Sequence, residues 1–134
     1  MNLEKIFKNI IIVNLGTFII AIISVFYESD EIFKISDNLS GGILLSNDGT
    51  STAELIILLT YFIIFFVSLY FIYKFKPFGK KLYTISFIAG SIITLISGPS
   101  IMGAVVYFLI ELHMASVGAI LAFLYFTPIK KKFN

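Results

Sequence analysis

Residues 55–73 of this sequence read LIILLTYFIIFFVSLYFIY, a stretch that contains no charged residue. A helix that spans a membrane needs about 20 mostly apolar residues. A transmembrane strand would instead alternate between polar and apolar residues, which this segment does not do. The segment therefore predicts a transmembrane helix.

Three further apolar segments follow the same pattern. The first comes directly after Lys5 and Lys8, as a signal peptide would, but it ends in Phe26 and Tyr27 rather than in the small residues of a cleavage site. We therefore interpret it as a retained helix. In a single domain that covers residues 1–134, helices are expected at about 10–27, 55–73, 82–97 and 110–127.

The composition agrees with an all-α integral membrane protein. Of the 134 residues, 58% are hydrophobic and 13% are charged, whereas soluble domains contain about 45–50% apolar and about 25% charged residues. A soluble enzyme, a disordered protein and a nucleic-acid-binding domain are therefore excluded. Without cysteine, and with His113 as the one histidine, the chain offers no thiolate or multi-histidine metal site. We expect no cofactor, no bound metal and no catalytic constellation.

The lysines predict the orientation of the four helices. Nine of the ten lie in the N-terminal region, in the connection between the second and third helices or in the C-terminal tail. Only Lys34 lies in the loop between the first and second helices, residues 28–54, which we call the outer loop. Four spans put those three regions on one side of the membrane, and the positive-inside rule makes that side the cytoplasm. Clustered lysines also attract anionic lipid headgroups.

The connections predict where two helices begin and how they pair. Residues 51–54, Ser-Thr-Ala-Glu, fit a capping box, which places the start of the second helix near Thr52. The inner connection around Pro77 and Gly79 is short, so the second and third helices are expected to be antiparallel neighbours.

The last apolar stretch is too long for one perpendicular span. Counted back from Lys130, 20 residues reach Ile110, which leaves residues 101–109 as surplus. We expect a break near Ile110, with residues 101–109 as a segment in the outer interface. The alternative is one long, steeply tilted helix.

Three helices carry stripes of small or polar residues, whereas the second helix is aromatic nearly all round and is expected to face lipid or a partner. One interpretation is that the stripes pack a four-helix bundle. The other is that the polar residues line a path. Glu111 and His113 are ionisable residues in a membrane helix, and such residues are candidates for a functional role. About 200° of rotation around the helix axis separates them, so they do not share one face of a regular helix. The candidate residues for a polar path or an assembly face are Asn14, Thr17, Ser86, Gly90, Thr94, Glu111, His113, Gly118 and Ala122.

Residues 118–133 read GAILAFLYFTPIKKKF. This tail resembles that of a group of small, functionally uncharacterised bacterial membrane proteins with four helices and a C-terminus like G-A-I-L-A-x-x-Y-F-S/T-P-I/L-K-x-K-F. The resemblance covers roughly residues 76–133, and the first half of the chain matches only in hydropathy. It implies a multi-pass protein of the bacterial inner (plasma) membrane and brings no activity with it.

Three functions stay open at this point. The first is a non-catalytic protein that works through helix–helix association with itself or with a membrane-protein partner. The second is a homo-oligomeric channel or a carrier for a small solute or ion, in which Glu111 forms a ring that attracts cations. The third is a membrane-resident immunity or phage-defence component, an analogy of size and topology alone.

Overall fold

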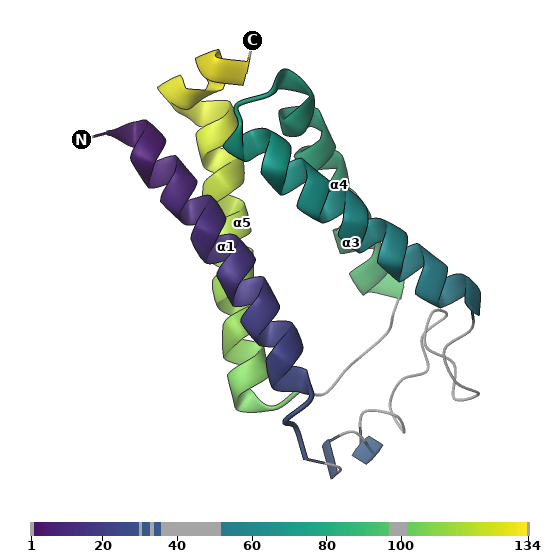
Figure 1. Cartoon of the computed structure of the whole chain (residues 1–134). Helices are drawn as coiled ribbons and strands as arrows, with labels where there is room; N and C mark the ends of the chain where they lie inside the picture. The colour runs from purple at the N-terminus through teal and green to yellow at the C-terminus, as the bar shows by residue number, and fades with distance from the viewer. Residues whose placement is uncertain (1, 30, 33, 36–51, 97–101, 134) are drawn as a thin grey trace.

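The computed structural model describes residues 2–29, 31, 32, 34, 35, 52–96 and 102–133. Within these residues the chain is helical and contains no strand. Its elements are α1 (Leu3–Val25), α3 (Thr52–Tyr73), α4 (Pro77–Ile96), α5 (Ala104–Phe126) and a short 3₁₀-helix, η1 (Pro128–Phe133) (Figure 1).

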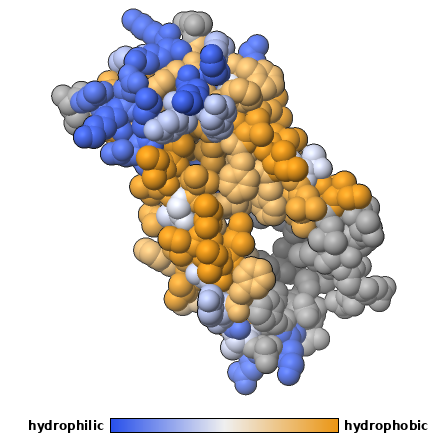
Figure 2. Space-filling model, in the orientation of Figure 1, coloured by the Kyte–Doolittle hydropathy of each residue, from blue (hydrophilic) through white to orange (hydrophobic). Residues whose placement is uncertain are grey.

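All four α-helices are long and apolar enough to cross a membrane. Figure 2 shows a broad apolar surface over the helices, with hydrophilic residues gathered at the end that carries both termini. The all-α class and the four candidate spans predicted from the sequence are therefore confirmed.

Two helices begin earlier than their apolar segments. α1 begins at Leu3 because the Asn2 side-chain oxygen accepts hydrogen bonds from the backbone of Glu4 and Lys5, at 3.1 and 3.3 Å. α4 begins at Pro77, whose fixed φ angle and missing N–H suit the first helical position. α3 begins at Thr52, as predicted.

The predicted break near Ile110 is wrong. α5 runs without interruption from Ala104 to Phe126, so residues 104–109 form its first turns. Gly103 precedes the helix with an extended backbone, and its N–H donates to the Glu28 carboxylate at the end of α1. At about 1.5 Å per residue, the 23 residues of α5 are about 34 Å long, which a modest tilt accommodates in one span.

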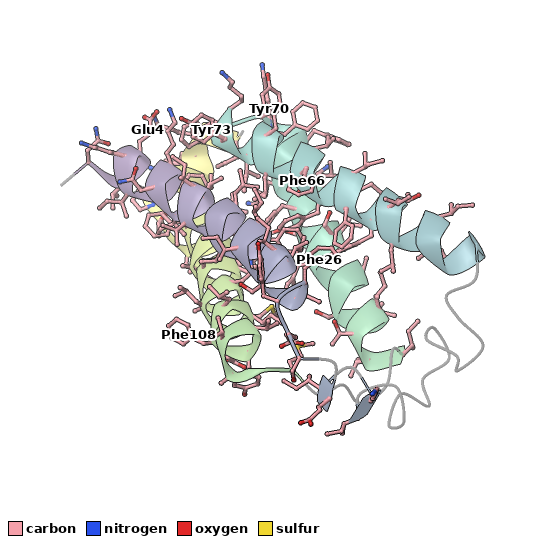
Figure 3. All side chains as sticks on the ribbon, turned by 60° about the horizontal axis from the view of Figure 1, so that its bottom comes forward. Glu4, Phe26, Phe66, Tyr70, Tyr73 and Phe108 are labelled. Carbon is pink, nitrogen blue, oxygen red and sulfur yellow. The ribbon has the colours of Figure 1, made fainter. Side chains whose placement is uncertain are left out.

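The helices pack as two pairs. α1 lies along α5 and α3 lies along α4, as the short α3–α4 connection predicted, whereas the backbones of the two pairs approach each other at few places. Figure 1 shows that the pairs meet near the termini and the α3–α4 turn and diverge towards their other ends. Figure 3 shows Glu4 of α1 and Tyr73 of α3 at the end where the pairs meet.

Aromatic rings join the two pairs at this end. The buried Phe7 ring of α1 packs on Phe75, Phe123 and Phe133, with centroids 5.8, 5.7 and 6.1 Å away. η1 folds back so that Ile129 and Phe133 are buried. Its Lys132 pairs with Glu4, which also pairs with Lys8 at 3.2 Å.

α3 contributes more to the core than its sequence predicted. Phe65, Leu69 and Ile72 are buried, while Phe66 and Tyr70 are exposed, and Tyr70 points away from the other helices (Figure 3). The expectation that this helix faces lipid or a partner stays a prediction, and it concerns the exposed side alone.

The α3–α4 turn needs a glycine. Phe75 takes a left-handed conformation with φ of 54°, and the Lys76 N–H closes the helix end by donating to the Phe71 carbonyl at 2.9 Å. α4 then returns so closely that a Cβ atom on Gly79 would lie 2.7 Å from the backbone of Phe71 and Ile72.

Replacing Gly79 with Ala is therefore expected to lower the free energy of unfolding by about 1–3 kcal/mol, because backbone atoms would have to move. Gly16→Ala is the matched control, since a Cβ at Gly16 meets nothing within 4 Å. Thermal unfolding in detergent micelles, followed by circular dichroism, measures both variants. Equal stability of the two variants would contradict the close approach.

Candidate functional site

A cluster of polar side chains joins α1 to α5 halfway along both helices. Asn14, the central residue of α1, is fully buried. Its side-chain nitrogen donates to the Ser116 hydroxyl at 2.7 Å and lies 3.1 Å from Nδ1 of His113. The Ser116 hydroxyl in turn donates to the His113 carbonyl at 2.6 Å. Hydrogen bonds between helices contribute to helix association in lipid, together with close packing.

The same contacts orient the His113 ring. Its Nδ1 also lies 3.2 Å from the Asn14 carbonyl, so this ring nitrogen is fully engaged by one residue of α1. The ring packs against Phe18 and Phe65, with centroids 5.2 and 5.9 Å away. The other nitrogen, Nε2, has no hydrogen-bond partner in the described part of the chain.

His113 also lines a cavity between the two helix pairs. The cavity is lined by residues from all four long helices. Its volume of about 310 Å³ is at the small end of the range for small-molecule sites. Its walls are mainly apolar, aliphatic as well as aromatic, and among the described residues no acidic or basic side chain apart from the His113 imidazole lines it. The aromatic residues are Phe18, Tyr61, Phe62, Phe65, Tyr83 and Phe87.

Gly90 shapes one wall of this cavity. A Cβ atom on Gly90 would clash with the hydroxyl of Tyr61. Because Gly90 has no side chain, the Tyr61 ring can extend from α3 to the surface of α4. Thr94 lines the cavity one turn further along α4, and its hydroxyl donates to the Gly90 carbonyl at 3.0 Å.

The other candidates from the sequence have different surroundings. Thr17 and Ser86 are buried, but their hydroxyls donate to carbonyls of their own helices, at 2.9–3.0 Å. Glu111, Gly118 and Ala122 are exposed on α5, and a Cβ at Gly118 would meet nothing within 4 Å. The structure thus brings Asn14 to His113 and places Gly90 and Thr94 on the cavity wall, but it leaves Glu111 outside this group.

Sequence reasoning missed Ser116, Tyr61 and Tyr83. Ser116 follows His113 by three residues and therefore shares its face of the helix, a spacing that could have identified it. Tyr61 and Tyr83 lie in aromatic and mixed stretches in which nothing distinguishes a cavity residue from a core residue. Among the residues that the structure describes, no three His, Asp or Glu side chains gather as metal ligands.

Comparisons of this chain with protein-family models, with curated proteins and with solved structures found no match.

The buried amide predicts a specific loss of stability. Asn14→Ala removes the bonds between α1 and α5, and it is expected to lower the free energy of unfolding by about 1–2 kcal/mol. Thr17→Ala, one turn away, removes a hydroxyl that is bonded only within α1 and is expected to cost less than half as much. Equilibrium unfolding in mixed micelles compares the two, and equal losses would argue against the cluster as the joint between the helices.

Proposed function

We propose that this chain is a non-catalytic, multi-pass protein of the bacterial inner membrane that acts through helix–helix association, with itself in the first place and otherwise with a membrane-protein partner. The four apolar helices support a multi-pass location. The resemblance of the tail to small bacterial membrane proteins supports the bacterial assignment.

The distribution of charge supports cytoplasmic termini. Both termini and the α3–α4 turn lie at one end of the molecule (Figure 1), and nine of the ten lysines belong to these regions. The positive-inside rule directs such an end to the cytoplasm. There the exposed Lys130 and Lys131 would lie against anionic lipid headgroups.

The observation that carries the proposal is an uncovered stripe on α5. Glu111, Ala115, Gly118 and Ala122 follow one another at intervals of four, three and four residues, and all four are exposed. Small side chains of this spacing let a second helix approach closely. In the described part of the chain this space is open at Gly118, where a Cβ would meet no atom within 4 Å.

Two features beside the stripe fit an approaching helix. A shallow groove of about 330 Å³ lies between α1 and α5, with Val13, Leu112, Ala115 and Ala119 among its walls. The carboxylate of Glu111 would otherwise face lipid, where an acidic group at the centre of a span costs about 2.5–3.5 kcal/mol on insertion scales. Association would give that carboxylate polar partners.

Bulky side chains in the stripe are therefore expected to prevent assembly. Native mass spectrometry of the gently extracted wild-type protein should show a homo-oligomer, and the double variant Gly118→Leu, Ala122→Leu should be monomeric. The control is Gly16→Leu, which adds a side chain of the same size on α1, at a position where a Cβ also meets no atom within 4 Å. This variant should form the same oligomer as the wild type. An unchanged oligomer in the double variant would refute the α5 face, and a wild-type monomer would refute self-association.

A channel or carrier for a small ion is the second candidate, favoured by the position of Glu111 on the same stripe. Subunits that close a ring around this face would carry a ring of carboxylates, which attracts cations. Cation conductance in planar bilayers should then fall several-fold in Glu111→Gln. Conductance that does not respond to this substitution would exclude that role for the carboxylate.

A further inference from the structure

The cavity between the helix pairs is positioned to receive a molecule from the membrane. Its inner wall belongs to the core, because Phe65, Tyr83 and Val117 line it and are each at most 5% exposed. Away from the termini the pairs diverge (Figure 1), and Figure 2 shows an opening between them. In a bilayer such a space lies among lipid tails, so a molecule dissolved there can reach it.

The walls favour a flat ring. Phe18, Phe62 and Phe87 are among six aromatic residues that line a cavity of about 310 Å³. Aromatic faces and edges attract one another in offset-stacked and edge-to-face geometries, beyond the effect of buried area alone. A compact ring system can use several of these faces at once, whereas a flexible alkyl chain uses only the buried area.

The polar groups favour a neutral molecule that carries oxygen atoms. Among the residues that the structure describes, no Asp, Glu, Lys or Arg lines the cavity, so a fully charged ligand would meet no counter-ion from them. Three lining groups lack a hydrogen-bond partner among the described residues, namely Nε2 of His113 and the hydroxyls of Tyr61 and Tyr83. The hydroxyls of Ser91 and Thr94 already donate to their own helix and can only accept.

We propose that this cavity binds a neutral, membrane-soluble ring compound with carbonyl oxygens, the chemical class of the quinones. The Tyr61 hydroxyl and His113 Nε2 would hydrogen-bond to the carbonyl oxygens, and the aromatic walls would stack on the ring. A lipid acyl chain is the competing occupant, but it would leave both polar groups unpaired, and unpaired buried polar groups are costly. The inference is independent of the association face on α5.

Isothermal titration calorimetry of the full chain in detergent micelles tests the proposal with menadione, a small ring diketone, as the probe. The chain has no cysteine that could react with it. Saturable binding is expected, and 2-methylnaphthalene, which has the same rings without oxygen, should bind at least tenfold more weakly. Tyr61→Phe, which removes one hydroxyl and keeps the ring, should weaken menadione binding about fivefold.

Two substitutions on α4 separate the cavity from simple partition into micelles. Thr94→Phe fills the cavity wall and should weaken binding at least tenfold. Ile92→Phe adds a similar ring on an exposed side chain outside the cavity and should change affinity less than twofold. Equal binding by both variants, or no saturable binding by the wild type, would overturn the proposal. Competition by dodecanol at the same concentration as menadione would also overturn it, because it would assign the cavity to alkyl chains.

Discussion

The arrangement of the whole chain depends on one joint of aromatic rings near the termini. Phe7 of α1 stacks with Phe123 of α5, and it meets Phe75 and Phe133, whose own ring centroids are 5.5 Å apart. The backbones of the two helix pairs approach each other at few other places, although Phe18 of α1 also packs on the rings of Phe62 and Phe65 of α3. Since lipid tails are as apolar as these side chains, packing geometry rather than water exclusion favours the joint.

The joint explains two local features that would otherwise be unfavourable. A non-glycine residue in the left-handed conformation costs about 1–2 kcal/mol, yet Phe75 adopts it with φ of 54°. Its ring is packed against Phe7 and Phe133, and the amines of Lys8 and Lys132 each lie 5.3 Å from its centroid. These contacts offset the strain, and they also hold η1 against the helices.

Away from the joint, polar contacts hold one pair together, while the rings of Phe18 and His113 still contact Phe65 of the other pair. Asn14 fixes α1 to α5 through His113 and Ser116. The α3–α4 pair relies instead on the close approach at Gly79 and on apolar packing. Because each pair is held by its own contacts, the pairs can diverge and leave the cavity between them. The contacts of Asn14 also orient the His113 ring, so that Nδ1 faces Asn14 while Nε2 has no hydrogen-bond partner among the described residues.

The class and number of helices were predictable because they depend on local composition. The run at 55–73 and the clustered lysines need no knowledge of tertiary contacts. Helix ends were less predictable: the capping box at residues 51–54 located the start of α3, whereas the start of α1 was inferred from apolar residues alone and Asn2 caps this helix well before its apolar segment begins. The break near Ile110 failed because a tilted helix tolerates surplus length.

The candidate site was predictable only in part, because its groups come from different helices. Asn14 and His113 each stood out as polar residues in apolar surroundings, but their pairing depends on the register of α1 against α5. Tyr61 lies in a helix with many aromatic residues, so its sequence position did not distinguish it. Its place beside Gly90 depends on how closely α3 approaches α4, which the sequence pattern of one helix does not show. Glu111, the most conspicuous residue in the sequence, lies outside the cavity, on the exposed stripe of α5.

The divergence of the two helix pairs is the central claim, since both the cavity and its openness depend on it. Distances between spin labels test it directly, and the absence of native cysteine makes labelling straightforward. Exposed positions on α1, on α3 and directly after α3 suit the two pairs of labels: Lys5 with Lys74 near the joint, and Ile23 with Ile57 at the far end. The account predicts a clearly longer distance at the far end than at the joint. Equal distances at the two ends would mean that the four helices form a closed parallel-sided bundle, and the cavity would not exist.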